Sequence, residues 1–148
     1  MKAVIQRVTK ASVTVDGKVV GSIGAGLLVL VAFGEGEQES VLTPFINKLY
    51  NMRIFPNESG RFDRSLLDIS GELLLVPQFT LYADTRKGRR PEFFGALNPE
   101  LAKNYFEKLV ETARDFADLK VASGRFGAYM QVALINDGPV TIPLEINA

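Results

Sequence analysis

Most of this chain alternates apolar and polar residues in short segments, which is typical of β-strands. The first strand begins at Met1, and the alternation resumes over residues 11–16, where Asp16-Gly17 predicts a hairpin turn into a second strand over residues 18–23. Residues 27–33 are all apolar and too few for a normal helix, so they predict a buried central strand. Further strands are predicted over residues 72–83, 127–135 and 140–146.

Two segments carry apolar residues at helical spacing instead. Residues 40–51 predict one helix, with Ser40 as its N-cap and Pro44 early enough to be tolerated. A second helix is predicted after Asn98, because asparagine caps well and Pro99 suits the first helical position. Two helices are too few for a doubly wound parallel sheet. We therefore expect a mixed, β-rich fold: a largely antiparallel β-barrel or sandwich with two α-helices packed outside.

The composition restricts the chemistry that is possible. The 148 residues, 47% of them hydrophobic, fit a single domain over residues 1–148. The sequence contains no histidine and no cysteine, which excludes Ser-His and Cys-His nucleophiles, zinc sites built on those residues, and disulfides. The carboxylates of Asp63, Asp68 and Glu72 lack metal-ligand spacing and are interpreted as solvated turn residues. We expect no metal and no cofactor.

Charge and hydropathy give a prediction about partners and location. The 17 basic residues balance the 17 acidic ones, so a nucleic-acid partner would need a local basic patch. The sequence shows neither a basic and apolar leader nor an apolar run of about 18 residues. We expect a soluble, cytoplasmic protein that does not bind membranes.

The most unusual segment is Gly138-Pro139, between the last two predicted strands. Proline has no N–H to donate, so strand pairing must be interrupted there, and an X-Pro bond adopts the cis form at modest cost. Arg7 lies on the first strand beside Val4 and Val8. A guanidinium there is expected to meet a carboxylate or a backbone carbonyl.

A second unusual segment surrounds Pro77, which interrupts the predicted strand over residues 72–83. Proline within a strand indicates a bulge or an edge position. A bulge would direct the backbone N–H groups of Phe79 and Thr80 toward a ligand, whereas an ordinary edge strand would leave Gln78 facing solvent. Thr80 is a weak candidate nucleophile, because the chain has no histidine to activate it.

Two loops add further candidates. Residues 85–91 contain four cations, which form either a solvated face or a phosphate-binding loop. Phe126 and Met130 lie in a connection between two predicted strands, where they belong either to the core or to the lining of a pocket.

Both unusual segments together resemble those of the D-aminoacyl-tRNA deacylase family. The family patterns are Ser-Gln-Phe-Thr-Leu and Asn-x-Gly-Pro-Val-Thr, and here they stand at residues 77–81 and 136–141. The resemblance also covers residues 1–8, 51–55, 87–91 and 126–128. Pro77 replaces the family's serine, as in a sister branch with relaxed chirality, but Phe79 and Val140 place the chain with the main branch.

This resemblance implies a homodimeric β-barrel enzyme of the D-Tyr-tRNA deacylase type. Such an enzyme hydrolyses the ester between a D-amino acid, or glycine, and the terminal ribose of tRNA, and rejects L-aminoacyl-tRNA. It implies a cis Gly138-Pro139 bond that each subunit inserts into its partner's pocket as a chiral gate, held by Arg7. The other implied site residues are Gln78, Phe79 and Thr80 around the ester; Pro77, Phe126 and Met130 at the pocket; and Lys87, Arg89 and Arg90 toward tRNA.

The implied chemistry needs no reactive side chain. An aminoacyl ester is already activated, the neighbouring ribose hydroxyl can assist the attacking water, and backbone N–H groups can stabilise the oxyanion. From the residues alone, two other classes stay open. One is a non-catalytic barrel that binds RNA or a small ligand, with Gly138-Pro139 as a structural turn. The other is a dimeric scaffold in which this segment serves only assembly.

Overall fold

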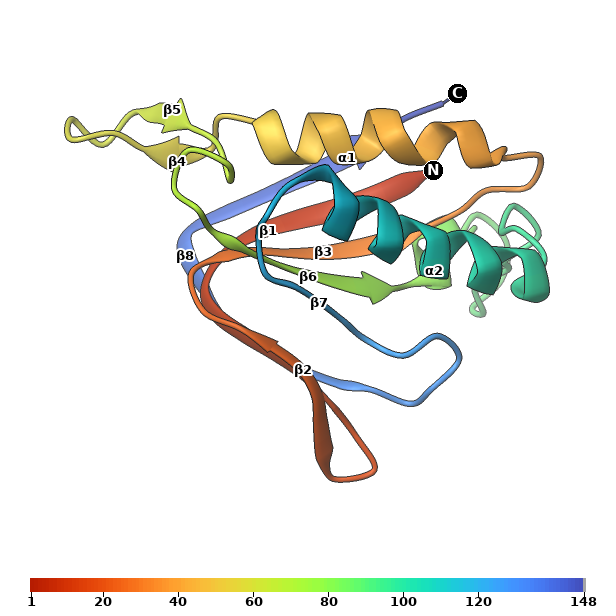
Figure 1. The fold of residues 1–148 in the computed structure, drawn as a ribbon. Coiled ribbons are helices and arrows are strands. Elements are labelled where there is room, and N and C mark those ends of the chain that lie inside the picture. The colour runs from red at the N-terminus through yellow and green to blue at the C-terminus, as the bar shows by residue number, and fades with distance from the viewer. Residues whose placement is uncertain (148) are drawn as a thin grey trace.

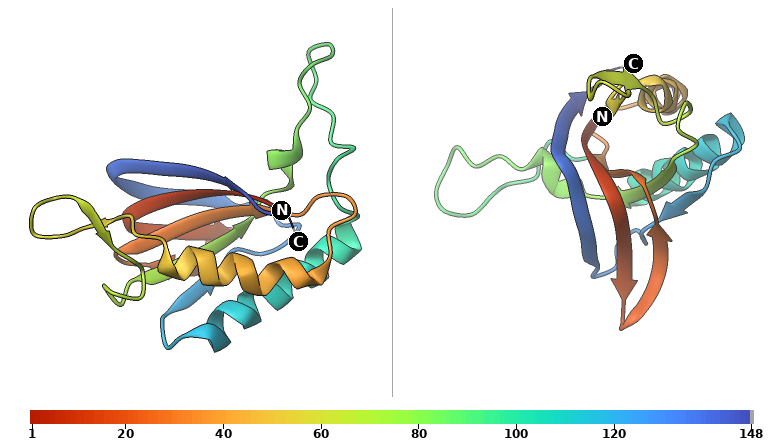
Figure 2. Two further views of the ribbon diagram at one scale, coloured as in Figure 1. Left: turned by 90° about the horizontal axis from the view of Figure 1, so that it is seen from above. Right: turned by 90° about the vertical axis from the view of Figure 1, so that its left-hand side faces the viewer.

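The computed structural model describes residues 1–147, and six of its strands form one strongly curved sheet (Figure 1). The long strand β1 (Lys2–Val15) pairs with β3 (Gly26–Ala32) along its first half and with β2 (Lys18–Ile23) along its second. Its other edge pairs with β8 (Gln131–Glu145), and all three pairings are antiparallel. The sheet curls until β2 lies next to β7, which gives a nearly closed, barrel-like shape (Figure 2).

Two strands correct the expectation of a largely antiparallel sheet. β6 (Glu72–Pro77) runs parallel to β3, and β7 (Val121–Ser123) runs parallel to β6. A parallel pair needs a long crossover, usually through a helix. Here α1 (Leu42–Asn51) lies in the connection from β3 to β6, and α2 (Pro99–Phe116) in the connection from β6 to β7. The sheet is therefore mixed, with one helix for each parallel step.

Both helices cover the same face of the sheet, as Figure 1 shows. Asn98 is confirmed as the N-cap of α2, because its side-chain oxygen accepts from the N–H groups of Glu100 at 3.0 Å and Leu101 at 3.3 Å. The N-cap predicted at Ser40 is wrong. A short 3₁₀ turn, η1 (Glu39–Val41), precedes α1 and contains Ser40, so no side chain caps α1.

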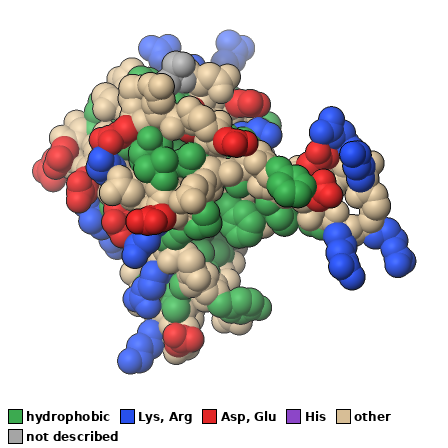
Figure 3. All heavy atoms as spheres, turned by 90° about the vertical axis from the view of Figure 1, so that its right-hand side faces the viewer, with side chains coloured by type: hydrophobic (Ala, Val, Ile, Leu, Met, Phe, Trp, Pro, Cys, Tyr) green, Lys and Arg blue, Asp and Glu red, His purple; other side chains and the backbone are tan. Residues whose placement is uncertain are grey.

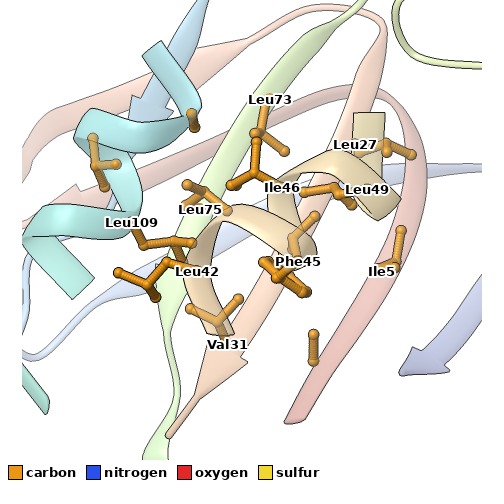
Figure 4. Close-up of a cluster of buried hydrophobic side chains, with 14 of the residues drawn as sticks. Ile5, Leu27, Val31, Leu42, Phe45, Ile46, Leu49, Leu73, Leu75 and Leu109 are labelled. Carbon is orange, nitrogen blue, oxygen red and sulfur yellow. The ribbon is translucent and has the colours of Figure 1, made fainter. Parts of the chain in front are cut away.

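The main core lies between the helices and the sheet. Figure 4 shows Phe45, Ile46 and Leu49 of α1 directed toward strand residues such as Leu27 and Leu73. The Tyr50 hydroxyl donates to the Ala113 carbonyl at 2.8 Å and links α1 to α2. A second cluster fills the other face of the sheet, beneath β2 and the start of β8. Because β3 is buried on both faces, its sequence is continuously apolar, as predicted.

The hairpin predicted at Asp16-Gly17 is confirmed. Both residues have positive φ, 50° and 76°, which is the requirement of the two-residue turn that matches strand twist. A smaller hairpin, β4 (Phe55–Pro56) with β5 (Phe62–Arg64), follows α1 and lies outside the main sheet. Among residues 1–147, no helix is both long and apolar enough to span a membrane.

Two strands end or begin elsewhere than predicted. The strand predicted over residues 72–83 stops at Pro77, and residues 79–82 form the 3₁₀ helix η2 (Phe79–Tyr82). Pro77 forms no bulge, because its register with β3 is regular. It does lie at a local edge, since β7 pairs only with Leu73, Leu74 and Leu75 and leaves the other side of Pro77 unpaired. The last two predicted strands are one strand, β8, which begins at Gln131 rather than Gly127.

The interruption predicted at Gly138-Pro139 is present within β8. Asn136 pairs with Val8 and Thr141 with Gln6, so residues 137–140 stand opposite Arg7 alone. These four residues form a largely exposed bulge on the outermost strand of the sheet. We call them the β8 bulge.

Candidate functional site

The main pocket, of about 620 Å³, opens at the carboxyl end of β6. Five residues predicted for the site line it: Pro77, Gln78, Phe79, Phe126 and Met130. Thr80 lies one residue further along η2, outside the lining, where its hydroxyl accepts a hydrogen bond from the Gln78 side chain. The remaining lining residues are Val76, Phe93, Ala96, Leu97, Asn98, Pro99, Ala102, Gly127, Ala128, Tyr129 and Val132.

Backbone geometry leaves two N–H donors free beside this pocket. The N–H of Gln78 donates to the Val31 carbonyl at 2.7 Å, which fixes the start of η2 to β3. Further along, the N–H of Leu81 donates to the carbonyl of Gln78 at 3.2 Å. The N–H groups of Phe79 and Thr80 come between these and have no acceptor among residues 1–147, as is usual for the first donors of a helical turn.

The pocket wall is largely aromatic and apolar. Phe79 is 57% exposed, and its ring meets Phe93 edge-to-face at a centroid distance of 5.1 Å. Deeper in, Phe126 packs against Phe106 of α2 at 6.4 Å. Sequence reasoning missed Phe93 and Tyr129; the signal for Phe93 was an aromatic pair, Phe93-Phe94, directly after the basic loop.

The basic loop projects from the body as a narrow finger, which we define as residues 84–92 (Figure 2). Asp84 and Glu92 close its base by exchanging backbone hydrogen bonds of 2.7 and 2.9 Å. Hydrogen bonds donated by Arg86 lower the pKa of Asp84 to about 2, so these two charges neutralise each other. Lys, Arg and acidic side chains gather on this projection beside an apolar surface (Figure 3).

Three cations of the finger therefore remain available. Lys87, Arg89 and Arg90 are exposed, and within the described part of the chain none has an acidic partner within 4.0 Å. This is the local basic patch that a chain of zero net charge needs in order to hold phosphates.

The β8 bulge is held by Arg7, which is only 7% exposed. Its Nε donates to the Asp137 carbonyl at 3.0 Å, and its Nη1 donates to the Ile54 carbonyl at 2.7 Å, so the expected carbonyl partners are confirmed. The Asp137 carboxylate lies 3.5 Å from Nε. The guanidinium also lies over the ring of Phe62, at 5.9 Å.

Within the bulge, the Gly138-Pro139 peptide bond is cis. Gly138 has φ of 131°, and a Cβ there would lie 3.1 Å from Nη2 of Arg7 and 3.0 Å from Cγ2 of Val140. The position therefore requires glycine. Both Gly138 and Pro139 are exposed.

The pocket and the β8 bulge lie at opposite ends of the sheet in one chain. Arg7 is level with Leu27 and Leu73, whereas Pro77, which lines the pocket, lies four residues further along β6. At 3.3 Å per residue, this separation along the strands is about 13 Å. Across the sheet, β1 and β3 lie between β8 and β6, which adds a further ~14 Å. The structure does not bring these two sets of predicted site residues together within one copy.

Two acidic side chains near the turns accept hydrogen bonds from backbone N–H groups, as expected for structural turn residues. The Asp68 carboxylate accepts from the Ser65 N–H at 2.8 Å, and the hydrogen bonds from Ser65 lower its pKa. Glu72 accepts from the Gly24 N–H at 2.7 Å. Among residues 1–147, no cluster of acidic side chains is arranged to hold a metal ion.

Comparison with known proteins gives consistent matches over the chain. The profile of a family described as D-Tyr-tRNA(Tyr) deacylase matches residues 4–145. A protein of Roseiflexus castenholzii named D-aminoacyl-tRNA deacylase is 55% identical over 98% of this chain and 92% of its own length. One from Thermosipho melanesiensis, with the same name, is 50% identical over 98% of this chain and 97% of its own.

Solved structures share the fold. One described as the c-Myc DNA Unwinding Element Binding Protein has a TM-score of 0.93 and 42% identity, with all of both chains covered. Another, described as a probable eukaryotic D-amino acid tRNA deacylase, has a TM-score of 0.86 over 98% of each chain. At 19% identity, this second likeness concerns the fold alone.

Proposed function

Since this chain belongs to the D-Tyr-tRNA(Tyr) deacylase family and is a D-aminoacyl-tRNA deacylase, we propose that backbone atoms carry out its catalysis and its selection of substrates. The substrates are tRNAs charged with a D-amino acid or with glycine, and the products are free tRNA and the amino acid. Residues 1–148 act as a single deacylase domain in the cytoplasm, without metal or cofactor. The observation that carries this proposal is the pair of unpartnered N–H groups of Phe79 and Thr80 beside the pocket.

The reaction uses these two N–H groups as an oxyanion hole. Water, assisted by the neighbouring ribose hydroxyl of the substrate, adds to the ester carbon, and the carbonyl oxygen becomes negative. Phe79 and Thr80 stabilise that charge, the bond from carbon to the ribose oxygen breaks, and the ribose oxygen takes the proton. Removing one such donor costs about 10²–10³ in rate in a well-studied hydrolase, so two donors account for a large share of catalysis.

The apolar wall of the pocket favours this arrangement. Phe79, Phe93 and Phe126 exclude water around the ester, and in a dry site a fixed dipole interacts more strongly with the developing charge. Gln78 at the pocket mouth directs the Thr80 hydroxyl away from a nucleophilic role, because that hydroxyl already accepts the amide hydrogen of Gln78. Pro77 and Met130 complete the rim.

We further propose that the enzyme is a homodimer in which each β8 bulge enters the pocket of the partner subunit. The separation of bulge and pocket within one chain supports this, since only a second copy can bring Gly138 to the ester. The exposed outer edge of β8, with Val132 and Ile135 on it, offers a surface for such a copy.

In the dimer, Gly138 and Pro139 act as a chiral gate. With the ammonium and carbonyl groups of the substrate fixed, inversion at the α-carbon exchanges the hydrogen and the side chain. An L side chain then meets the backbone carbonyls of the gate, whereas a D side chain points away. Glycine has no side chain to collide and passes. Arg7 fixes the position of the gate through the Asp137 carbonyl.

The deciding experiment compares hydrolysis of D-, L- and glycyl-tRNA by the purified protein. We expect the D-aminoacyl and glycyl esters to be cleaved and the L-aminoacyl ester to remain. Binding of tRNA without any hydrolysis would favour a non-catalytic barrel instead. Equal cleavage of both enantiomers would contradict the gate.

A further inference from the structure

The pocket lining and the chain next to it carry exposed aromatic rings that the proposed chemistry does not use. Tyr129 is 89% exposed and lines the pocket, and Phe94, which follows the pocket residue Phe93, is 80% exposed. These are the two most exposed large apolar side chains among residues 1–147. Single exposed apolar residues are ordinary, but an exposed ring in the pocket lining, and another directly next in the chain to a lining residue, indicate a binding surface.

Backbone hydrogen bonds fix the chain next to both exposed rings, Tyr129 and Phe94. Tyr129 follows a turn in which the Ala128 N–H donates to the Arg125 carbonyl at 3.2 Å, and Gly127 has φ of 76°. Phe94 follows the closed base of the finger, directly after Phe93, whose ring is fixed against Phe79. The two rings are thus presented on short, hydrogen-bonded segments rather than on long loops.

Cations accompany both rings. Arg125 begins the turn that precedes Tyr129 and is exposed. Lys87, Arg89 and Arg90 lie on the finger, just before Phe94 in the chain. Figure 3 shows the apolar surface of this face running up to the charged finger. Aromatic rings on which bases stack, next to cations that follow a phosphate backbone, are the combination by which proteins bind single-stranded nucleic acid.

We propose that Tyr129 and Phe94 stack on the unpaired nucleotides of tRNA that directly precede the esterified terminal nucleotide. The inference rests on the proposed function, because the occupant of the pocket then fixes where this strand must leave the site. Unpaired bases at the 3′ end expose the faces that stacking needs, and their phosphates are complementary to Arg125 and the finger. Tyr129 and Phe94 are positioning residues: they hold substrate and take no part in the chemical step.

The test compares two substrates in the variants Tyr129→Ala and Phe94→Ala. One is D-aminoacyl-tRNA, and the other is D-aminoacyl-adenosine, which lacks the preceding nucleotides. Loss of one stacked base should raise KM for the tRNA by about 5- to 100-fold, with kcat unchanged. KM for D-aminoacyl-adenosine should stay as in the native protein.

Three matched variants sharpen the result. Tyr129→Phe keeps the ring and should restore the native KM, since stacking needs the π-face and not the hydroxyl. Phe94→Trp should do the same. Leu101→Ala removes an exposed apolar side chain on α2 that does not line this pocket, and should change nothing.

A binding readout makes the test independent of turnover. A single-stranded RNA with the 3′ sequence of tRNA and 2-aminopurine before its last nucleotide should lose fluorescence on binding, and should lose less with Tyr129→Ala. An unchanged KM for tRNA in both alanine variants would overturn the proposal, as would an equal rise of KM for both substrates. So would dissociation of a dimer in these variants, because a second copy would then be what covers the rings. Absence of hydrolysis of either ester by the native protein would instead reject the proposed function.

Discussion

In the proposed mechanism, the side chains next to the pocket matter less than the backbone that carries them. Gln78 donates its side-chain amide to the Thr80 hydroxyl, and Thr80 does not line the pocket. The N–H groups of Phe79 and Thr80, in contrast, have no acceptor in the described chain. A chain without histidine can still be a hydrolase if the atoms it contributes are donors of the main chain.

Thr80→Ala tests this directly. The substitution removes the hydroxyl but keeps the backbone N–H, so we expect kcat/KM for D-aminoacyl-tRNA to fall by less than about tenfold. Loss of a general acid or base costs roughly 10²–10⁴-fold, and a nucleophile more. Complete loss of activity in a variant with native circular dichroism and melting temperature would mean that Thr80 is the nucleophile.

Arg7 stabilises the β8 bulge by donating hydrogen bonds to two backbone carbonyls. Replacing it by methionine keeps much of the volume but leaves the carbonyls of Ile54 and Asp137 without their donor. We expect the free energy of unfolding to fall by about 1–3 kcal/mol and the preference for D- over L-aminoacyl-tRNA to fall as well. Chemical denaturation and paired D and L assays measure the two effects.

Arg7→Lys provides the matched control. It keeps the charge, but a single ammonium cannot reproduce the fork that reaches both carbonyls, so an intermediate result is expected. Native stability and native discrimination in Arg7→Met would show that the β8 bulge is held by other interactions.

At the scale of elements, each helix has two functions. α1 and α2 supply the apolar face that buries the sheet, and they also carry the chain over it, so that β6 and β7 run parallel to β3. The carboxyl ends of parallel strands meet at one edge, where open sheets commonly bind ligands. The pocket lies at that edge, between η2 and the start of α2.

The finger is the element expected to interact with tRNA. Replacing Lys87, Arg89 and Arg90 by glutamine should weaken tRNA binding and flatten its salt dependence, by about 0.7–0.9 in log–log slope for each phosphate that the protein no longer neutralises. Titrations at several salt concentrations measure the slope. Exposed cations elsewhere, Lys18, Lys48 and Lys103, give a triple variant of equal charge change that should keep the native slope.

If the finger variant kept both its affinity and its salt slope, the finger would be a solvated surface. Its shape should survive the substitutions in either case. The backbone pair between Asp84 and Glu92 and the ion pair between Asp84 and Arg86 do not involve the replaced side chains.

At the scale of the whole molecule, one copy holds the two halves of the proposed site too far apart to act on one ester. The β8 bulge stands opposite Arg7, whereas the pocket opens at the carboxyl end of β6, four residues beyond the level of Arg7. The proposed site therefore requires two chains, and we expect activity to depend on dimer formation.

Mixed dimers test this requirement. Ala128→Trp fills the pocket, and Gly138→Ala places a Cβ against Arg7 and Val140 in the β8 bulge. Each variant alone should be inactive or unselective. When the two are unfolded and refolded together, each mixed dimer should regain one native site of its two. The same proteins mixed without exchange of subunits serve as the control, and no recovery after exchange would place the whole site within one chain.

The local structure could be predicted from neighbouring residues alone. Strand alternation, hairpin turns and helix starts depend only on residues close in the chain. The hairpin at Asp16-Gly17, the central strand and the start of α2 at Asn98-Pro99 were therefore predicted close to their bounds. The absence of histidine and the segments at residues 77–81 and 136–141 also indicated the family and a backbone-based chemistry.

Only the tertiary structure decided what depends on distant residues. Whether β6 pairs parallel to β3, and so lies inside the sheet, depends on the path of the helix crossovers, and no local pattern around Pro77 encodes that path. The same holds for Tyr129, whose place at the pocket mouth depends on where β6, α2 and the finger meet. The spacing of apolar residues along the sequence indicates which side chains are buried. A site, in contrast, is formed by long-range packing between elements.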